Sequence, residues 1–156
     1  MTMPLTVSNY LAAHGVRYDL LEHPRAPTSR GRAAGAHVPS DHVAKAVILK
    51  DAEGYVMAVV PADHWLRLKA LRESLGRPLM LGDEREIEHL FPDCAPGAVP
   101  PLGPAYGMQT LVDDALLSLA ELYFEAGDHE QLVHTDGEGF RVLLHGARHG
   151  HLSHPH

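Results

Sequence analysis

A lysine inside an apolar stretch is the residue of this chain best suited to chemistry. Residues 43–49, Val-Ala-Lys-Ala-Val-Ile-Leu, are rich in β-branched and apolar side chains, a pattern that predicts a β-strand. Alternate side chains share a face of a strand, so Lys45 lies in one row with Val43, Val47 and Leu49. Because an unpaired buried ammonium is costly, Lys45 needs either a partner or a function.

Two interpretations of Lys45 are open at this point. In the structural one, Lys45 forms an ion pair, or its stem lies along the core with its head in solvent. In the functional one, Lys45 stands at the floor of a cleft. There it would bind a carbonyl or phosphate oxygen, or act as a base with a lowered pKa.

A proline-rich stretch about fifty residues further on favours the functional interpretation. Residues 91–107 are long for a connector, and long structured loops often carry function. Pro100 and Pro101 fix two φ angles and remove two N–H groups, which stiffens the backbone. Gly97 allows the backbone to approach a ligand closely. Such a loop can present fixed N–H and C=O groups to a reacting centre.

The composition limits the class of protein. A chain of 156 residues suits one domain with its own core, and no apolar run approaches the ~20 residues that span a bilayer. The net charge of −7 argues against a protein that coats long nucleic acids, but it leaves room for recognition of one nucleic-acid end. The single Cys94 excludes an internal disulfide, and residues 1–4 lack the pattern of a signal peptide. We therefore expect a cytoplasmic protein that does not enter a membrane.

Periodicity and turn signals predict one α+β domain over residues 1–146, with a mixed, largely antiparallel sheet surrounded by helices. Residues 147–156 are expected to form a flexible, His-rich tail. The expected strands lie at 16–20, 43–49, 55–60, 79–81, 108–112, 122–126 and 131–134. Two helices are expected to end near His14 and near Ala34, and two more to run from Asp63 to Leu75 and from Asp83 to Leu90. A short helical turn is expected at 115–119, and a last helix after a capping box formed by Thr135 and Glu138.

Three motifs in this order resemble the YbaK/ProX family of aminoacyl-tRNA deacylases, which includes the editing domain of bacterial prolyl-tRNA synthetases. The motifs are the strand with Lys45, a Gly-x-x-x-Pro loop at residues 97–101 followed by Leu102-Gly103, and the Ala-Gly-Asp-His turn at 126–129. Each motif alone is weak, whereas their order, spacing and total length are specific. The resemblance covers residues 5–144.

The resemblance implies hydrolysis of the ester that joins a wrong amino acid to its tRNA, without a metal or another cofactor. Lys45 matches the family's essential lysine and would anchor the substrate near the ester or the terminal phosphate. Gly97 is the second catalytic position, where backbone groups would hold the attacking water and the carbonyl. The partner would be the 3′ acceptor end of an aminoacyl-tRNA, with an aminoacyl-tRNA synthetase as a further candidate. The substrate-binding candidates are Ala46, Ala98, Val99, Pro100, Pro101, Gly103 and His129.

One position departs from the family pattern. Many members carry Thr, Asn or Ser directly after the lysine, whereas this chain has Ala46. A polar group that could orient the substrate is therefore missing, which leaves the amino acid specificity open. His129 is a candidate to contribute from the facing turn, and the alternative is a solvated turn histidine.

Other functions fit parts of the sequence. A binding module without catalysis would use the same pocket and leave the ester intact. Cys94 could serve a cysteine hydrolase, although no nucleophile motif surrounds it and a quiet thiol is the simpler interpretation. His64 and Trp65 are interpreted as packing residues, with His64 also a candidate at the pocket mouth. Five histidines could bind a metal, but no cysteine or carboxylate joins them at zinc-site spacing, so we regard such binding as adventitious: His145, His149, His151, His154 and His156.

Overall fold

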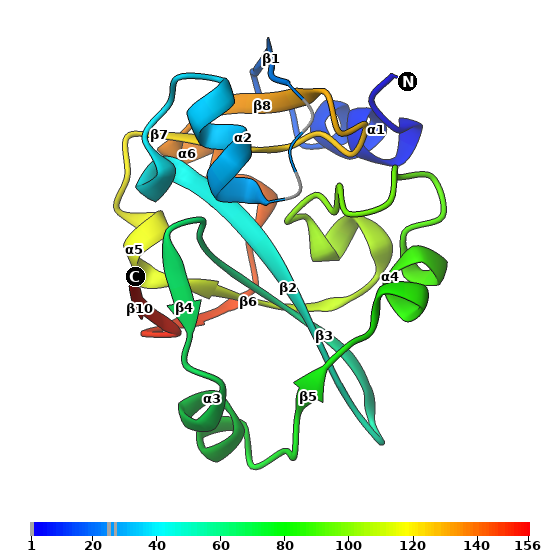
Figure 1. Ribbon diagram of the computed structural model, residues 1–156, viewed down its shortest axis with the longest axis vertical. Helices are drawn as coiled ribbons and strands as arrows, with labels where there is room; N and C mark the ends of the chain where they lie inside the picture. The colour runs from blue at the N-terminus through cyan, green and yellow to red at the C-terminus, as the bar shows by residue number, and fades with distance from the viewer. Residues whose placement is uncertain (1, 25, 27) are drawn as a thin grey trace.

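The computed structural model describes residues 2–24, 26 and 28–156. Among these residues, eight strands form a mixed sheet in the order β1-β8-β7-β2-β3-β6-β9, with β5 paired to β2 outside this path (Figure 1). Its strands are β1 (Asp19–Glu22), β2 (Val43–Asp51), β3 (Gly54–Pro61), β5 (Met80–Leu81), β6 (Gln109–Asp113), β7 (Glu121–Glu125), β8 (Gln131–Asp136) and β9 (Arg148–Gly150). A separate two-stranded sheet joins β4 (His64–Leu66) to β10 (Ser153–Pro155). The predicted α+β class with a largely antiparallel sheet is confirmed.

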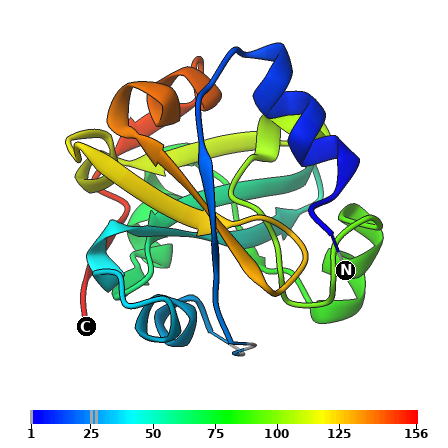
Figure 2. The ribbon, with the colours of Figure 1, turned by 90° about the horizontal axis from the view of Figure 1, so that it is seen from above.

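Helices cover both faces of the sheet. The α-helices are α1 (Leu5–Ala13), α2 (Ser29–Gly35), α3 (Leu68–Leu75), α4 (Glu84–Leu90), α5 (Asp114–Leu117) and α6 (Gly137–Leu143). Two short 3-10 helices, η1 (Ser40–His42) and η2 (Gly103–Tyr106), precede β2 and β6. Seen from above, α1 and α6 lie on one side of the strands and α2 lies on the other (Figure 2).

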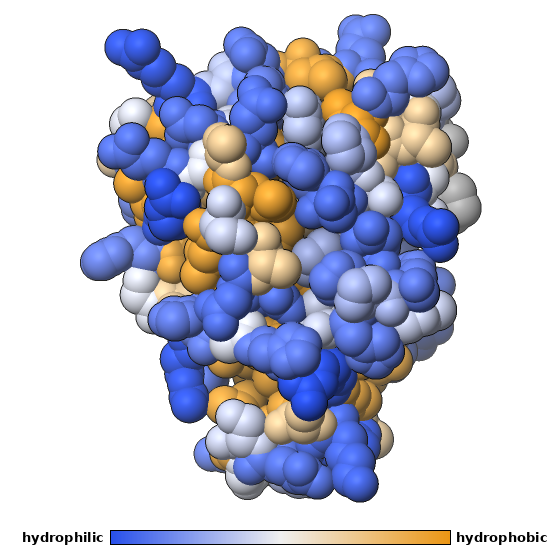
Figure 3. Space-filling view, turned by 90° about the vertical axis from the view of Figure 1, so that its left-hand side faces the viewer, coloured by the Kyte–Doolittle hydropathy of each residue, from blue (hydrophilic) through white to orange (hydrophobic). Residues whose placement is uncertain are grey.

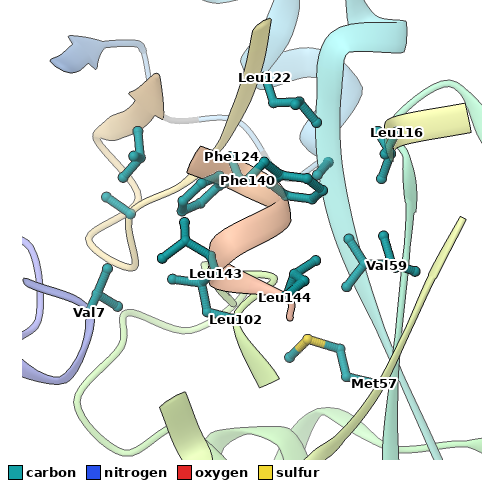
Figure 4. Packing of buried hydrophobic residues seen from close by; sticks show 14 of the residues in the cluster. Val7, Met57, Val59, Leu102, Leu116, Leu122, Phe124, Phe140, Leu143 and Leu144 are labelled. Atoms are coloured by element: carbon teal, nitrogen blue, oxygen red, sulfur yellow. The ribbon is translucent and has the colours of Figure 1, made fainter. Parts of the chain in front are cut away.

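The hairpin of β2 and β3 is the centre of the molecule. Its two strands pair antiparallel over their full length, which places Lys45 opposite Val60. Residues 56–60 of β3 are fully buried because apolar side chains pack against both faces. The larger cluster packs α1 and α6 against the sheet around Phe124 and Phe140, whose rings lie 6.4 Å apart (Figure 4). Rigid packing on both faces fixes the strand that carries Lys45.

The helix expected from Asp63 to Leu75 is shorter in the structure. Its helical spacing holds only from Leu68 onward, and His64–Leu66 instead pair as β4 with β10. Long-range strand pairing thus overrides the local helical pattern.

The cap predicted for the last helix is also wrong by one residue. Asp136 is the N-cap, and its carboxylate accepts a hydrogen bond from the Gly139 N–H at 2.7 Å. Thr135 remains in β8, where its hydroxyl donates to the Arg17 carbonyl at 3.0 Å. The strand extends this far because Asp136 still pairs with Glu121 of β7.

The segment expected to be a flexible tail contains two strands. β9 runs parallel to β6, and β10 runs antiparallel to β4. Leu152, which lies between the two strands, and Ser153, the first residue of β10, are both buried. The sheet edge at β6 supplies backbone partners that the local sequence does not reveal, so residues 148–155 are part of the fold. In the described part of the chain, no helix is long and apolar enough to cross a membrane.

Candidate functional site

A cavity of about 480 Å³ opens beside the first half of β2. Its walls come from β2, α2, α4, the loop that follows α4 and the turn between β7 and β8. The described residues that line it are Ser29, Arg32, Lys45, Ala46, Glu84, Ile87, Glu88, Phe91, Cys94, Ala95, Pro96, Gly97, Val99 and His129. Segments far apart in the sequence thus meet at one site.

Lys45 is half-buried in the wall of this cavity. Its Nζ donates to two backbone carbonyls, at 2.7 Å to His64 and at 3.3 Å to Ala62. Carbonyl acceptors orient the ammonium without neutralising its charge. Burial lowers the pKa of Lys45, while the charge of Asp63 acts to raise it and that of Arg30 to lower it further. Lys45 therefore lies in the cavity wall as a cation that two backbone carbonyls hold and that no ion pair neutralises among the described residues.

The carbonyls that hold Lys45 belong to a segment that the end of the chain fixes in place. The Ser153 hydroxyl donates to the buried Asp113 carboxylate at 2.5 Å, and its oxygen lies 2.8 Å from Nδ1 of His64. Because the hydroxyl proton is committed to Asp113, the Ser153 oxygen accepts from His64. His64, a candidate at the mouth by sequence, is turned toward Ser153 and is not among the described lining residues.

Gly97 lies in the cavity wall with a φ of +78°, in the left-handed region. A side chain there would be strained, and its Cβ would lie 3.6 Å from Nε2 of His129. The Gly97 carbonyl accepts a hydrogen bond from Nη2 of Arg32 at 2.5 Å. This bond fixes the orientation of the peptide at Gly97.

A buried ion cluster lies behind this wall and was not found from the sequence. Glu125 faces Nε of Arg32 at 3.4 Å and Nε2 of His23 at 3.3 Å. Its other oxygen accepts from the N–H groups of Gly127 at 3.2 Å and His129 at 2.9 Å. One carboxylate therefore ties α2 to the turn that carries His129, while Arg32 reaches the Gly97 loop. Sequence alternation gave no sign that Glu125, at the end of an apolar strand, would be buried.

The predicted substrate-binding residues divide into two groups. Ala46, Val99 and His129 line the cavity together with Lys45 and Gly97. The remaining four are buried behind the cavity and are not among the described lining residues: Ala98, Pro100, Pro101 and Gly103.

Gly103 has a packing reason of its own. A Cβ there would lie 2.0 Å from the Thr110 hydroxyl oxygen, so only glycine fits between η2 and β6.

The wall formed by α4 was also missed by the sequence analysis. Glu84, Ile87 and Glu88 line the cavity from this helix, and Phe91 follows at its end. The Asp83 carboxylate caps the helix, as predicted, by accepting from the Glu86 N–H at 2.8 Å. The cavity therefore has cationic groups on the side of β2 and α2, and carboxylates on the side of α4.

Cys94 lines the cavity, but its surroundings oppose a nucleophilic thiolate. Burial raises the pKa of the Cys94 thiol to about 12. Its sulfur lies 3.3 Å from the hydroxyl of Tyr106, which itself donates to Asp93 at 2.9 Å. A thiol with this pKa stays protonated at neutral pH, which argues against the cysteine hydrolase.

The histidines near the end of the chain have separate partners. His149 lies 2.7 Å from a carboxylate oxygen of Asp114, and His151 lies 3.2 Å from Nη1 of Arg67. Throughout the described ranges 2–24, 26 and 28–156, no three His, Cys, Asp or Glu side chains are grouped so that they could hold a metal ion.

Comparison with known proteins decides the family. The model of the aminoacyl-tRNA editing domain matches residues 23–143, which is more than half of the chain. The chain belongs to the aminoacyl-tRNA editing domain family. The match includes Lys45, Gly97 and His129, and so the whole cavity wall described above. No curated protein matches the chain significantly.

Solved structures agree with the fold. A candidate trans-editing enzyme for prolyl-tRNA synthetase is 22% identical, with a TM-score of 0.81 over 96% of this chain and 95% of that one. The hypothetical protein APE2540 is 25% identical, with a TM-score of 0.82 over 96% of this chain and 99% of that one. A protein described as acting in signal transduction, from Marinobacter aquaeolei, is 22% identical with a TM-score of 0.78; there the match covers 97% of this chain but only 31% of the other.

Proposed function

We propose that this editing domain hydrolyses the ester bond of a mischarged aminoacyl-tRNA as a separate protein, in trans to the synthetase that made the error. The observation that carries the proposal is that Lys45 and Gly97, fifty-two positions apart, lie in the wall of one cavity. A half-buried cation and a backbone turn fixed by Arg32 would supply charge stabilisation and orientation. An aminoacyl ester needs little more than these to react with water.

The reaction consumes one water molecule. The water oxygen attacks the carbonyl carbon, the bond to the ribose oxygen breaks, and that oxygen takes up a proton released by the attacking water. The products are the free amino acid and a tRNA with a free ribose hydroxyl. Lys45 would stabilise negative charge, either on the terminal phosphate or on the carbonyl oxygen as it becomes an oxyanion. The backbone at Gly97, fixed by Arg32, would position the water and the ester.

The charges around the cavity fit an aminoacyl ester. Its α-ammonium group would face the carboxylates of Glu84 and Glu88 on α4. The phosphate of the terminal nucleotide would face Lys45 on β2 and Arg32 on α2. The substrate therefore has one orientation that matches both sides of the cavity.

The proposal is tested by incubating a panel of mischarged tRNAs with the wild-type protein and with Lys45→Met. Methionine keeps most of the stem volume but removes the charge, so the fold should survive. We expect the variant to lose about 100-fold or more of the deacylation rate, as for the loss of one charge-stabilising group in an active site. The matched control is Lys69→Met, at an exposed lysine on α3, which should keep the full rate.

An unchanged rate in Lys45→Met would contradict the proposal. A wild-type protein that binds mischarged tRNA but leaves every ester of the panel intact would instead be the non-catalytic binding module.

A further inference from the structure

The nucleotide end of the substrate must lie outside the cavity when the amino acid lies inside it. The ester joins the amino acid to the terminal ribose, so the last nucleotides of the RNA have to rest on the rim. Next to the segment that holds Lys45, the surface of α2, β4 and the residue after β10 carries three side chains that suit this contact: Arg30, Trp65 and His156. They form what we call the rim platform, and its assignment rests on the proposed function.

Trp65 lies beside the residue that holds Lys45. Side chains alternate along β4, so His64 points inward to Ser153 while Trp65 points outward. Trp65 is 59% exposed as a residue, although large aromatic residues are mostly buried. The carbonyl of His64, directly before Trp65 in the chain, accepts a hydrogen bond from the Lys45 ammonium. An exposed aromatic surface therefore stands next to the anchor of the active lysine.

His156 extends this aromatic surface. Its ring packs on the indole of Trp65 with centroids 4.2 Å apart and a tilt of 35°. Its backbone N–H donates to the Asp63 carbonyl at 2.9 Å, which keeps β10 against β4. These contacts hold two flat rings together at the surface.

Arg30 supplies the positive charge of the rim platform. Its Nη1 lies 3.1 Å from Nδ1 of His156. A guanidinium can only donate, so this nitrogen of His156 accepts the hydrogen bond. Arg30 directly follows Ser29, which lines the cavity, and its charge acts on Lys45. Arg30 therefore links the rings of Trp65 and His156 to the part of α2 that lines the cavity.

The surface around the rim platform favours binding of a few nucleotides over binding of a long RNA. The face with β4, β10 and α5 is mostly hydrophilic, with apolar side chains in separate patches (Figure 3). The net charge of −7 disfavours an extended RNA-binding surface, whereas two rings and one guanidinium suffice for a few nucleotides. Proteins bind unpaired RNA by stacking bases on aromatic rings and by contacting phosphates with arginine.

We propose that the rim platform binds the unpaired nucleotides at the 3′ end of the tRNA. A base stacks on the open part of the Trp65 indole, which His156 supports from the other side. The Arg30 guanidinium contacts a phosphate of the same strand. This arrangement places the terminal ribose at the cavity mouth and the ester next to Lys45.

Trp65 is the only tryptophan of the chain, so its fluorescence reports on this contact directly. The wild-type protein is titrated with a short single-stranded RNA that ends in C-C-A with a free 3′ hydroxyl. Stacking predicts saturable quenching, with an affinity about tenfold weaker in Arg30→Ala and unchanged in Arg148→Ala, at an exposed arginine of β9. Absence of quenching, or equal quenching by a blunt RNA duplex without an unpaired end, overturns the proposal.

Kinetics separates this proposal from the proposed function. Trp65→Ala should raise the KM for aminoacyl-tRNA about tenfold with kcat nearly unchanged, and Trp65→Phe should restore most of the loss because it keeps a stacking ring. If the wild type hydrolyses no mischarged tRNA but the RNA still quenches Trp65, the proposed function fails and the rim platform stands. If deacylation proceeds with the same KM in Trp65→Ala, the rim platform is wrong and the hydrolase stands.

Discussion

At the scale of single residues, the charge on Lys45 should be visible in the pH dependence of deacylation. Burial lowers the pKa of Lys45 from the ordinary 10.5, and the proposed mechanism uses the ammonium form. Activity is then full below this folded pKa and falls as pH rises through it, so the alkaline limb of kcat/KM should lie below pH 10.5. The measurement is the enzymatic rate after subtraction of spontaneous ester hydrolysis.

Two neighbours should move this limb in opposite directions. Asp63→Asn removes a charge that raises the pKa of Lys45, so the limb should shift to lower pH. Arg30→Ala removes a charge that lowers the same pKa, so the limb should shift to higher pH. A limb that stays fixed in both variants would mean that a group other than Lys45 controls the rate.

At the scale of elements, the cavity depends on Arg32 of α2, which joins three separate segments. Arg32→Ala would leave the Glu125 carboxylate buried without this cation and the Gly97 carbonyl without this donor. Breaking a buried ion pair in this way typically costs about 3–5 kcal/mol, so we expect a loss of that order in the free energy of unfolding. Urea denaturation measures it, with Arg141→Ala on α6 as an exposed control.

Arg32→Lys separates the two contacts of this side chain. A lysine restores a positive charge near Glu125, but it lacks the planar fork that reaches Glu125 and Gly97 together. Stability should therefore recover in part while kcat stays low, because the peptide at Gly97 is no longer held. Recovery of both together would show that Arg32 serves the Gly97 loop only through overall stability.

The same elements show how far the sequence could be interpreted. Apolar alternation predicted the β2–β3 hairpin and placed Lys45 in it, because local pattern and tertiary burial agree there. The pattern failed at His64–Leu66, where the pairing partner lies almost ninety residues away at Ser153–Pro155. In the site, Lys45, Gly97 and His129 carry recognisable motifs, but Arg32 and the glutamates of α4 do not. Their place in the wall depends on how α2 and α4 pack, which no local signal encodes.

At the scale of the whole molecule, the two sides of the cavity differ in how firmly they are packed. The sheet side, at β2, is packed on both faces, whereas the opposite side is α4, a helix at the protein surface. The backbone of β2 is buried between two apolar clusters, so the position of the Lys45 backbone is fixed. α4 has no buried residue: Ile87 and Leu90 pack against the larger cluster while partly exposed, and Glu86 forms the polar contacts with the hairpin. Glu86 accepts hydrogen bonds from Lys50 at 2.5 Å and from the hydroxyl of Tyr55 at 2.7 Å. The carboxylate side of the cavity therefore depends on an ionised Glu86.

This dependence predicts how acid acts on the folded molecule. Hydrogen bonds from Lys50, Tyr55 and the backbone of Asp83 lower the pKa of Glu86 from 4.5 to about 2. A folded pKa below the unfolded one means that the stabilisation is complete above about pH 4.5 and is lost as pH falls toward about 2. Glu86→Gln should therefore lower the urea midpoint at pH 7, and the difference from wild type should shrink steadily below pH 4.5. Glu73→Gln, at an exposed glutamate of α3, should match wild type at every pH. Wild-type and Glu86→Gln midpoints that stay the same distance apart down to pH 2 would show that α4 is held by something other than this carboxylate.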